Sequence, residues 1–360
     1  MPWTTPCRWV WPARSLGLAR IDLNTTVLEG GAFEVDGDGV LMTTRSSILE
    51  PNRNPGVTQA QLQTVLTTNL GVTKFIWLDG FPGGQDDITD THIDGFAKFG
   101  PSGTIVTMSN ADLNYWGLSA ADINTLNCAT DITNAPYSFV RLPLTARNVV
   151  TKYGMNLGYK GSYVNYYVAN TVVLVPAYND PNDAVAKAAL QKLYPGRTVV
   201  GIDVRNLYAQ GGMVHCVTQQ QQWIESDCTH PTKSGNQESN LNRRRFLSQT
   251  GAAIAAMAVT NELLAADETR MDKMPDYQSA GVKLLTNSNP AADGFHFPTE
   301  WELHDHTIMV LPPPQNWKSY GIPLKDVRGQ WADVPRQSQG GAASRGPHVQ
   351  RMENQVPAIQ

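Results

Sequence analysis

The sequence predicts an α/β protein assembled from several similar strand and helix modules. Short apolar strands separated by turn signals recur from residue 21 to residue 224, and amphipathic helices lie between some of them. The 30 glycines and 23 prolines among alternating apolar runs are typical of many short strands and turns. The sequence has no phosphate-loop signature, which argues against a doubly wound nucleotide-binding fold.

Length and charge limit the classes of function. A chain of 360 residues can bury a full core, and its formal net charge of -4 gives no basic footprint for nucleic acid. We therefore expect a small-molecule partner. The four cysteines, Cys7, Cys128, Cys216 and Cys228, have neither zinc-site nor disulfide-framework spacing. The longest apolar run, around Gly251 to Val259, is too short to span a membrane, so we expect no stable membrane anchor.

The first third of the predicted catalytic part begins with a hairpin. Residues 1–19 show no period and are expected to be irregular, whereas residues 21–49 contain two apolar segments with Asp38-Gly39 as a hairpin turn. Thr58 is expected to cap an amphipathic helix over residues 59–70. A buried strand over residues 74–78 then leads into an acidic stretch.

That acidic stretch, residues 83–99, is the centre of the prediction. It contains four carboxylates that repel one another unless a cation lies among them: Asp86, Asp87, Asp90 and Asp94. A strand period would put His92 and Asp94 on one face, as a compact pair for acid/base chemistry and for holding a cation. The alternatives are an acidic loop that caps the next element or a calcium loop. The calcium alternative is weaker because the central glycine and closing glutamate of an EF-hand are missing.

The next elements continue the same alternation. The expected strands cover residues 105–108, 138–143 and 198–202, with a strand pair over 161–176 that turns at Asn170; the expected helices cover residues 119–130 and 180–193. Asn165 interrupts the apolar run of the strand pair. Its amide is either a satisfied polar group in a sheet or a contact for a polar ligand atom.

Cys216 is the candidate nucleophile. It follows the Gly211-Gly212 pair in a short apolar strand, where backbone amides could lower the pKa of a thiol. The alternative is an inert core cysteine. On a strand, His215 would point to the opposite face, so His92 is the candidate base. Glu29, just before a second Gly-Gly pair, is either a turn acid or a site residue.

These motifs together resemble a known family. The segments VLEGGAFEVDGDG, NRNP, WLDGFPGGQDDITDTHID, GSYVNYYVAN and GGMVHCVTQQ are similar, in register, to the agmatine deiminase and bacterial peptidyl-arginine deiminase family. The resemblance covers roughly residues 20–224 and implies a five-bladed α/β propeller, the pentein fold of enzymes that modify guanidino groups. We expect residues 20–228 to form the deiminase-like catalytic part.

The resemblance also implies the site and its reaction. Cys216 would be the nucleophile, His92 the general acid/base, Asp94 a carboxylate that holds guanidinium, and Glu29 the partner that orients His92. Asn165 and Asp86 are further expected substrate contacts. Agmatine would be hydrolysed to N-carbamoylputrescine and ammonia through a covalent thiouronium, with no metal or organic cofactor. Peptidyl-arginine deimination is the alternative.

The order of the segments departs from the family. Residues 229–294 form a linker in which Ser239 to Ala266 resembles a twin-arginine export signal. Residues 295–334 resemble the family's amino-terminal strand and helix, and residues 335–360 read as a disordered tail. The order is therefore permuted. The expected location is the bacterial cytoplasm, or the periplasm if the internal signal is used.

One family motif is missing. Members carry a Trp-x-Arg-Asp motif whose Asp is the second carboxylate for guanidinium, and this sequence has no such motif; residues 331–333, WAD, lack the arginine. We therefore expect an incomplete propeller. The alternative from another class is a non-catalytic fused or truncated remnant, in which exposed strand edges would favour self-association.

Overall fold

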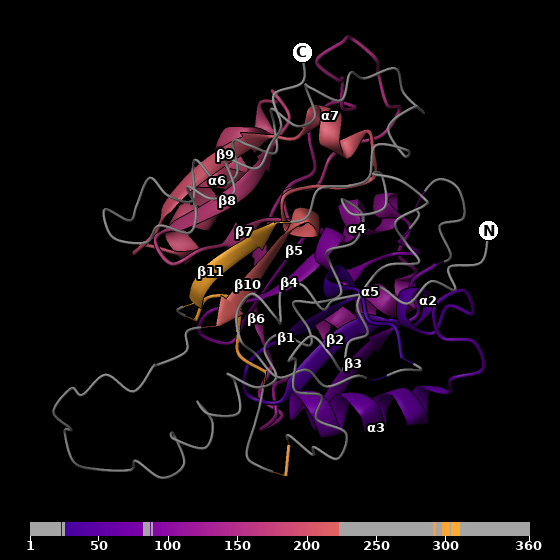
Figure 1. Cartoon of the computed structure of the whole chain (residues 1–360). Coiled ribbons are helices and arrows are strands. Elements are labelled where there is room, and N and C mark those ends of the chain that lie inside the picture. Colours follow the sequence, from indigo (N-terminus) through magenta and orange to yellow (C-terminus); the bar gives the residue numbers. More distant parts are fainter. Residues whose placement is uncertain are drawn as a thin grey trace, which may run out of the picture.

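The computed structural model describes residues 23, 26–81, 87, 89–222, 291, 292, 297–302 and 304–309. Within them the chain is a mixed α/β protein with four separate sheets (Figure 1). Three of the sheets share one plan, in which an antiparallel strand pair is followed by a helical connection and a third strand parallel to the second. We call each of these three units a module.

The first module contains β1 (Phe33–Val35), β2 (Val40–Thr44), α3 (Gln59–Leu70) and β3 (Lys74–Leu78), with the one-turn helix α2 (Arg45–Ile48) after β2. Strands β1 and β2 are antiparallel, and β2 and β3 are parallel. The β1–β2 hairpin and the bounds of β3 agree with the sequence prediction. All five residues of β2 are buried, as expected for a central strand covered on both faces.

Helix α3 begins and ends where its sequence predicts. The Thr58 hydroxyl accepts a hydrogen bond from the Gln61 amide, and the Gln61 side chain in turn accepts from the Thr58 amide, which satisfies free donors of the first turn. Gly71 ends the helix in a left-handed conformation with φ 71°. The leucines at positions 62, 66 and 70 are buried on one face.

The second module contains β4 (Ala97–Gly100), β5 (Thr104–Thr107), α4 (Asn110–Trp116), α5 (Ala120–Asn127) and β6 (Ser138–Arg141). Strand β5 pairs antiparallel with β4 and parallel with β6. The predicted helix after Ser119 is confirmed as α5, although it ends earlier than expected. The sequence prediction missed α4.

Helix α4 has clear local signals that could have identified it. The Ser109 side chain caps it by accepting from the Asp112 amide, Asp112 places an acidic group in the first turn, and Gly117 is left-handed at the end. A capped helix of seven residues simply has too few apolar positions to give a helical period.

The third module contains β7 (Tyr167–Val168), β8 (Val172–Ala177), α6 (Asn182–Leu193) and β9 (Thr198–Asp203), with α7 (Arg205–Tyr208) after it. The antiparallel β7–β8 pair and the parallel β8–β9 pair repeat the plan of the other modules. The helix, the last strand and the second half of the predicted strand pair are confirmed, but the first half of that pair is wrong in extent, because its strand covers only Tyr167–Val168 and residues 161–166 are outside any strand.

The fourth sheet is built differently. It pairs β10 (Thr218–Gln222) antiparallel with β11 (His304–Met309), a strand that comes much later in the chain (Figure 1). Residues 297–302 precede β11. We call residues 297–302 and β11 together the docked segment. The segment therefore lies against the first part of the chain, an arrangement that the sequence left open.

Tight turns precede the first strand of each sheet. These are the 3-10 turns η1 (Gly30–Ala32), η2 (Ile93–Gly95) and η3 (His215–Val217), and a turn around Asn165 in which the Tyr166 amide donates to the Val164 carbonyl. The expectation that Asp94 and Cys216 lie on strands is wrong. Both belong to 3-10 turns, which point their side chains away from the sheets and toward a shared centre.

The core is largely formed where the modules meet. Alternate residues of the first sheet, such as Val40 and Met42, face a cluster shared with the second and third modules, whereas Leu41 packs against the leucines of α3. No helix in the described ranges has the length and hydropathy needed to cross a bilayer.

Candidate active site

The Cys216 thiol lies among side chains supplied by three different turns. Its Sγ is 3.3 Å from Asn165 Nδ2 and 3.7 Å from Asp94 Oδ2. Asn165 and Asp94 are fully buried, whereas Cys216 is partly exposed. The Asn165 carboxamide holds the turn, because its Oδ1 accepts from the His215 amide at 2.8 Å and its Nδ2 donates to the Asp94 carbonyl at 3.3 Å. A potential nucleophile and a carboxylate are thus held together.

His92 reaches the same centre from the residue before η2. Its Nε2 is 2.7 Å from Glu29 Oε2, and the same carboxylate oxygen accepts from Arg53 Nε at 2.6 Å. Arg53 also contacts Asp90, with Nη1 2.8 Å from Oδ2. This chain of ion pairs fixes the imidazole ring by its Nε2 and leaves Nδ1 to face the centre of the site.

Gly31 links the two groups of residues. A β-carbon at this position would lie 2.6 Å from Asp94 Oδ2 and 2.7 Å from His92 Nδ1. Both atoms therefore border one small space, which the hydrogen of Gly31 leaves open and any other side chain would fill. This close approach explains why a glycine is required at Gly31, in the Gly-Gly pair after Glu29.

Burial and neighbouring charges set the protonation of the thiol and its carboxylate. Burial alone would raise the pKa of Asp94, but hydrogen bonding and the positive charge of His215 outweigh it and lower that pKa below its usual value. Burial and the Asp94 charge together raise the pKa of the Cys216 thiol. In the site without substrate, Asp94 is therefore ionised and Cys216 is a neutral thiol.

The imidazole of His92 has the opposite tendency. Burial would lower its pKa, but the hydrogen bond and charge of Glu29 raise it above its usual value. The pKa of Glu29 is correspondingly lowered, since its contacts with His92 and Arg53 outweigh the effect of its burial. His92 can therefore hold a proton near neutral pH and deliver it to a leaving group.

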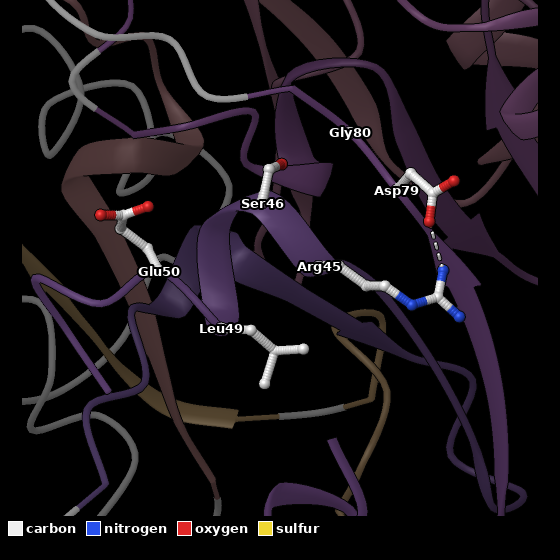
Figure 2. A pocket seen from close by; sticks show the side chains of 6 residues that line it. All are labelled: Arg45, Ser46, Leu49, Glu50, Asp79 and Gly80. Atoms are coloured by element: carbon white, nitrogen blue, oxygen red, sulfur yellow. Dashed lines mark hydrogen bonds and ion pairs between the residues drawn. The ribbon is translucent and has the colours of Figure 1, made fainter. Parts of the chain in front are cut away.

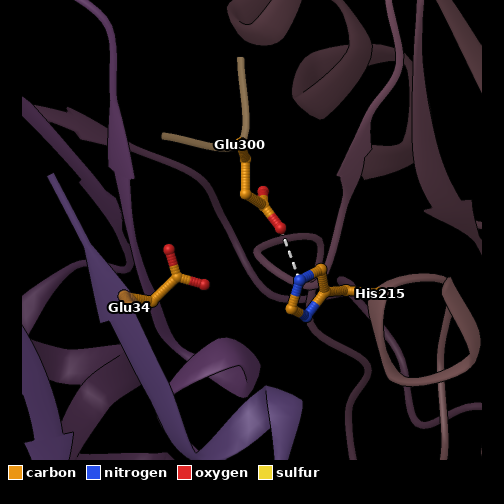
Figure 3. A group of neighbouring side chains, drawn as sticks. All are labelled: Glu34, His215 and Glu300. Carbon is orange, nitrogen blue, oxygen red and sulfur yellow. Dashed lines mark ion pairs between the residues drawn. The ribbon is translucent and has the colours of Figure 1, made fainter. Parts of the chain in front are cut away.

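A second charged cluster lies behind Asp94. His215 Nδ1 is 2.8 Å from Asp94 Oδ2, and its Nε2 is 2.5 Å from Glu300 Oε1, as Figure 3 shows for the Glu300 contact. Lys98 Nζ is 2.7 Å from Glu34 Oε1 and 2.9 Å from Glu300 Oε2. All five groups are buried or nearly so.

This cluster has the donor types of a metal site but already contains its cation. Ligand atoms of Glu34, His215 and Glu300 lie within 4.8 Å of one another. The Lys98 ammonium, with no exposed surface, contacts both carboxylates. We therefore assign the cluster to charge pairing and not to metal binding.

An open cavity of about 340 Å³ lies elsewhere, between α2 and the end of β3. Its lining includes Arg45, Glu50 and Asp79, and Figure 2 shows the ion pair between Arg45 Nη1 and Asp79 Oδ1, 2.8 Å apart. Both charged groups of that pair are well exposed. None of the candidate catalytic side chains lines it, and we assign it no role.

The structure brings together most of the residues that the sequence indicates. Cys216, Asp94 and Asn165 are in contact, and His92 with Glu29 borders the same space across Gly31. The remaining candidate, Asp86, lies outside the described residues. The sequence prediction also placed His215 away from Cys216, which is wrong, because the 3-10 turn lets both side chains reach Asp94 Oδ2.

Some site residues were missed by the sequence analysis. Arg53 lies in the NRNP motif, and the available signal was the distant acidic stretch, whose carboxylates repel one another unless a cation lies among them. Lys98 and Glu34 lie in apolar strands, where a charged residue is rarely buried without a partner. Glu300 had no local signal, since its partners come from distant segments.

Comparisons with known proteins agree with this geometry. The sequence profile of the Porphyromonas-type peptidyl-arginine deiminase family matches residues 8–222. An agmatine deiminase of Pseudomonas fluorescens is 37% identical over 213 residues, which are 54% of this chain and 57% of the relative. A protein of Latilactobacillus sakei, provisionally named agmatine deiminase, is 35% identical over 57% of this chain and 60% of its own length.

A solved structure supports the fold. An X-ray structure of a protein provisionally named agmatine deiminase superimposes with a TM-score of 0.53 at 27% identity, over 58% of this chain and 60% of that chain. The chain thus spans somewhat more than half the length of the relatives that it matches. Since the family profile covers more than half of the sequence, the chain belongs to the Porphyromonas-type peptidyl-arginine deiminase family.

Proposed function

We propose that this chain hydrolyses the guanidino group of agmatine, giving N-carbamoylputrescine and ammonia. The observation that carries the proposal is the position of the Cys216 thiol, 3.7 Å from the buried Asp94 carboxylate, with His92 facing the same carboxylate. A planar guanidinium held by Asp94 would present its central carbon to Sγ. The names of the Pseudomonas and Latilactobacillus relatives support agmatine as the substrate.

The first step uses the charge of the substrate. The pKa of the Cys216 thiol is raised by burial and by Asp94, so the free site holds a neutral thiol. A guanidinium beside Asp94 adds a positive charge next to Sγ and favours loss of the thiol proton to water, because an opposite charge within a few ångströms stabilises the thiolate. The thiolate then attacks the guanidinium carbon and forms a C–S bond.

The second step uses His92. As the C–N bond breaks, the imidazolium of His92 gives its proton to the departing nitrogen, which leaves as ammonia, and a cationic thiouronium remains on Cys216. The neutral imidazole then takes a proton from water as the water attacks the same carbon. Collapse of this adduct breaks the C–S bond, and its hydroxyl proton passes to Sγ, which releases the ureido product and restores the neutral thiol. Glu29 and Arg53 hold the ring through both steps.

Among the residues that the structure describes, Asp94 alone would hold the substrate guanidinium beside Sγ, from one side. Asp94 is the carboxylate beside Sγ, and the family's Trp-x-Arg-Asp motif is missing from the sequence. Losing one charge-assisted contact to a cation costs about 2–5 kcal/mol in binding or activation free energy, which lowers kcat/KM by roughly 30-fold to several thousand-fold. We therefore propose a slow deiminase. We also propose that the full fold is the five-bladed propeller that the resemblance implies, supported by the turns that four sheets direct to one centre.

The test is chemical and uses two cysteine variants. The full-length protein is incubated with agmatine, and ammonia and N-carbamoylputrescine are measured for the wild type, Cys216→Ala and Cys128→Ala. We expect product from the wild type and from Cys128→Ala, whose thiol is exposed and remote, and none above background from Cys216→Ala. Equal rates for the two variants would remove Cys216 from the mechanism.

Peptidyl-arginine is the second candidate substrate, because the family profile carries that description. The reacting group is the same, and the far end of the substrate differs. Citrulline formation in an arginine-containing peptide, measured beside agmatine turnover, separates the two. If neither substrate reacts, the chain is a non-catalytic member of the family.

A further inference from the structure

The docked segment contacts all three modules. The Phe297 amide donates to the Leu70 carbonyl at the end of α3 at 2.8 Å, and its ring lies edge-on to that of Phe33 in β1. The Trp301 carbonyl accepts from Arg197 Nη2 in the third module at 2.6 Å. Between these two anchors, Glu300 points inward. Its position is therefore fixed by backbone contacts on both sides.

Glu300 contacts two buried cations, one of which belongs to the turn of Cys216. Its Oε1 is 2.5 Å from His215 Nε2, and its Oε2 is 2.9 Å from Lys98 Nζ. Figure 3 shows the His215 ring between the turn of η3 and the Glu300 carboxylate. Lys98 also has Glu34 as a partner, so it keeps a carboxylate even without Glu300. Without Glu300, the Nε2 of His215 loses its carboxylate.

His215 passes this contact on to the reacting region. Its Nδ1 is 2.8 Å from Asp94 Oδ2, the same oxygen that lies 3.7 Å from Cys216 Sγ. A ring whose two nitrogens both face carboxylates donates from both, which requires the imidazolium form. A neutral ring has one donor, and a carboxylate at its other nitrogen would face a lone pair.

We propose that Glu300 is a positioning residue of the active site, and that it fixes the Asp94 carboxylate beside Cys216 by holding His215 as a cation. The proposal rests on the deiminase function proposed above, because it assigns Asp94 to the guanidinium. The site is then assembled from two separated stretches of the chain, the modules with β10 and the docked segment. Glu300 touches neither the substrate nor the thiol.

The charges around His215 support this assignment. Burial and the Lys98 charge lower the pKa of His215, but Glu300 and Asp94 outweigh them and raise it to about 9. The titratable groups that face the ring are Asp94 from η2, Lys98 from β4, Glu34 from β1, Glu300 from the docked segment and Cys216 from its own turn. Among these, Glu300 is the one anion that the docked segment adds.

The test compares two glutamate variants of the full-length protein. Glu300→Gln keeps the shape and removes the charge, and Glu302→Gln makes the same change at an exposed position two residues later. Three quantities are measured between pH 5.5 and 10: the pKa of His215 by NMR with labelled histidine, the alkylation rate of Cys216 by iodoacetamide, and kcat/KM for agmatine. Peptide mass spectrometry separates Cys216 from the other cysteines.

For Glu300→Gln we expect the pKa of His215 to fall from about 9 toward 7. At pH 8 the ring would then be mostly neutral, and kcat/KM would fall roughly tenfold, whereas at pH 6 it would stay within about twofold of the wild type. The pH profile of Cys216 alkylation would shift with it. Glu302→Gln should behave as the wild type in all three measurements.

The outcomes separate the two proposals. An unchanged His215 pKa in Glu300→Gln, or a loss of kcat/KM that is equal at pH 6 and pH 8, overturns the positioning role. If the wild type does not turn over agmatine, the shifts of the His215 pKa and of Cys216 alkylation still decide the role of Glu300. Should Glu300→Gln fail to fold, Glu300→Asp keeps the charge on a shorter side chain, and it must retain a His215 pKa above 8 for the proposal to stand.

Discussion

The three modules and the fourth sheet present the same kind of turn at the site, but they are stabilised in different ways. Each module is a continuous stretch of chain, with a strand pair, a helical connection and a parallel strand. The fourth sheet pairs β10 with a strand from a distant part of the chain, and buried charges join them to the rest. A module can therefore form from local contacts, whereas the fourth sheet requires a long loop to close first.

The largest expected effect concerns the Lys98 ammonium, which joins Glu34 of the first module to Glu300 of the docked segment. Lys98→Met leaves Glu34 and Glu300 buried without their shared cation, and we expect a loss of about 3–5 kcal/mol in the free energy of unfolding. Urea unfolding followed by fluorescence measures it. The control is Lys187→Met on the exposed face of α6, expected to change stability by less than about 0.5 kcal/mol. Equal losses in both variants would contradict the role of the charge cluster.

The next effect is a dependence on pH. The pKa of His215 is raised from 6.5 to about 9. Protonated His215 therefore stabilises the folded state fully below pH 6.5, and this contribution to the free energy of unfolding is lost as the pH rises through about 9. The shift corresponds to about 3 kcal/mol between pH 6.5 and pH 9.5. Urea unfolding of the wild type at several pH values measures this loss. Glu300→Gln should show a much flatter dependence, and a slope as steep as that of the wild type would sink the assignment.

A smaller effect is expected where the docked segment packs on the first module. Gly37 has φ +83°, and a β-carbon there would lie against the methyl group of Thr299. Gly56 has φ +73° with open space around it, so it is a matched control for the backbone alone. We expect Gly37→Ala to lose about 2 kcal/mol more than Gly56→Ala in a urea melt, because the methyl groups collide. Identical losses would show that Thr299 does not pack on this glycine.

The smallest effect lies wholly inside one module. Thr58→Ala removes the cap of α3 and should cost about 1 kcal/mol, while Thr64→Ala, on the exposed face of the same helix, should be near neutral. Both are measured by thermal unfolding. The alkylation rate of Cys216 should not change in either variant, since α3 is remote from the thiol. A slower or faster reaction in Thr58→Ala would mean that module and site are coupled.

Local signals explain which parts of the fold the sequence predicts. Helix α3 and strand β3 have the expected bounds, because a threonine cap, an αL glycine and an apolar period are all encoded within a few residues. The sequence predicts strands where turns η2 and η3 lie, because residues around Asp94 and Cys216 alternate apolar and polar side chains as a strand does. Two or three residues are too short to give a 3-10 turn its own period.

The candidate site was predictable to the extent that its motifs are local. The pairing of His92 with Glu29 and the approach of Asp94 to Cys216 join residues far apart in sequence, and the resemblance of their motifs to a known family made these contacts predictable. Glu300 has no such motif at its own position. Its partners, His215 and Lys98, come from other sheets, and only the docked position of residues 297–302 reveals them.

The convergence of one turn from each sheet has a consequence for how such a chain can be rearranged. Glu29, Asp94, Asn165 and Cys216 each reach the centre from the start of their own sheet, so their arrangement does not depend on the order in which the sheets are synthesised. A gene could be cut and rejoined between sheets, or divided into two polypeptides, and still encode the same cluster of atoms. The proposed chemistry would then require only that the separate pieces associate.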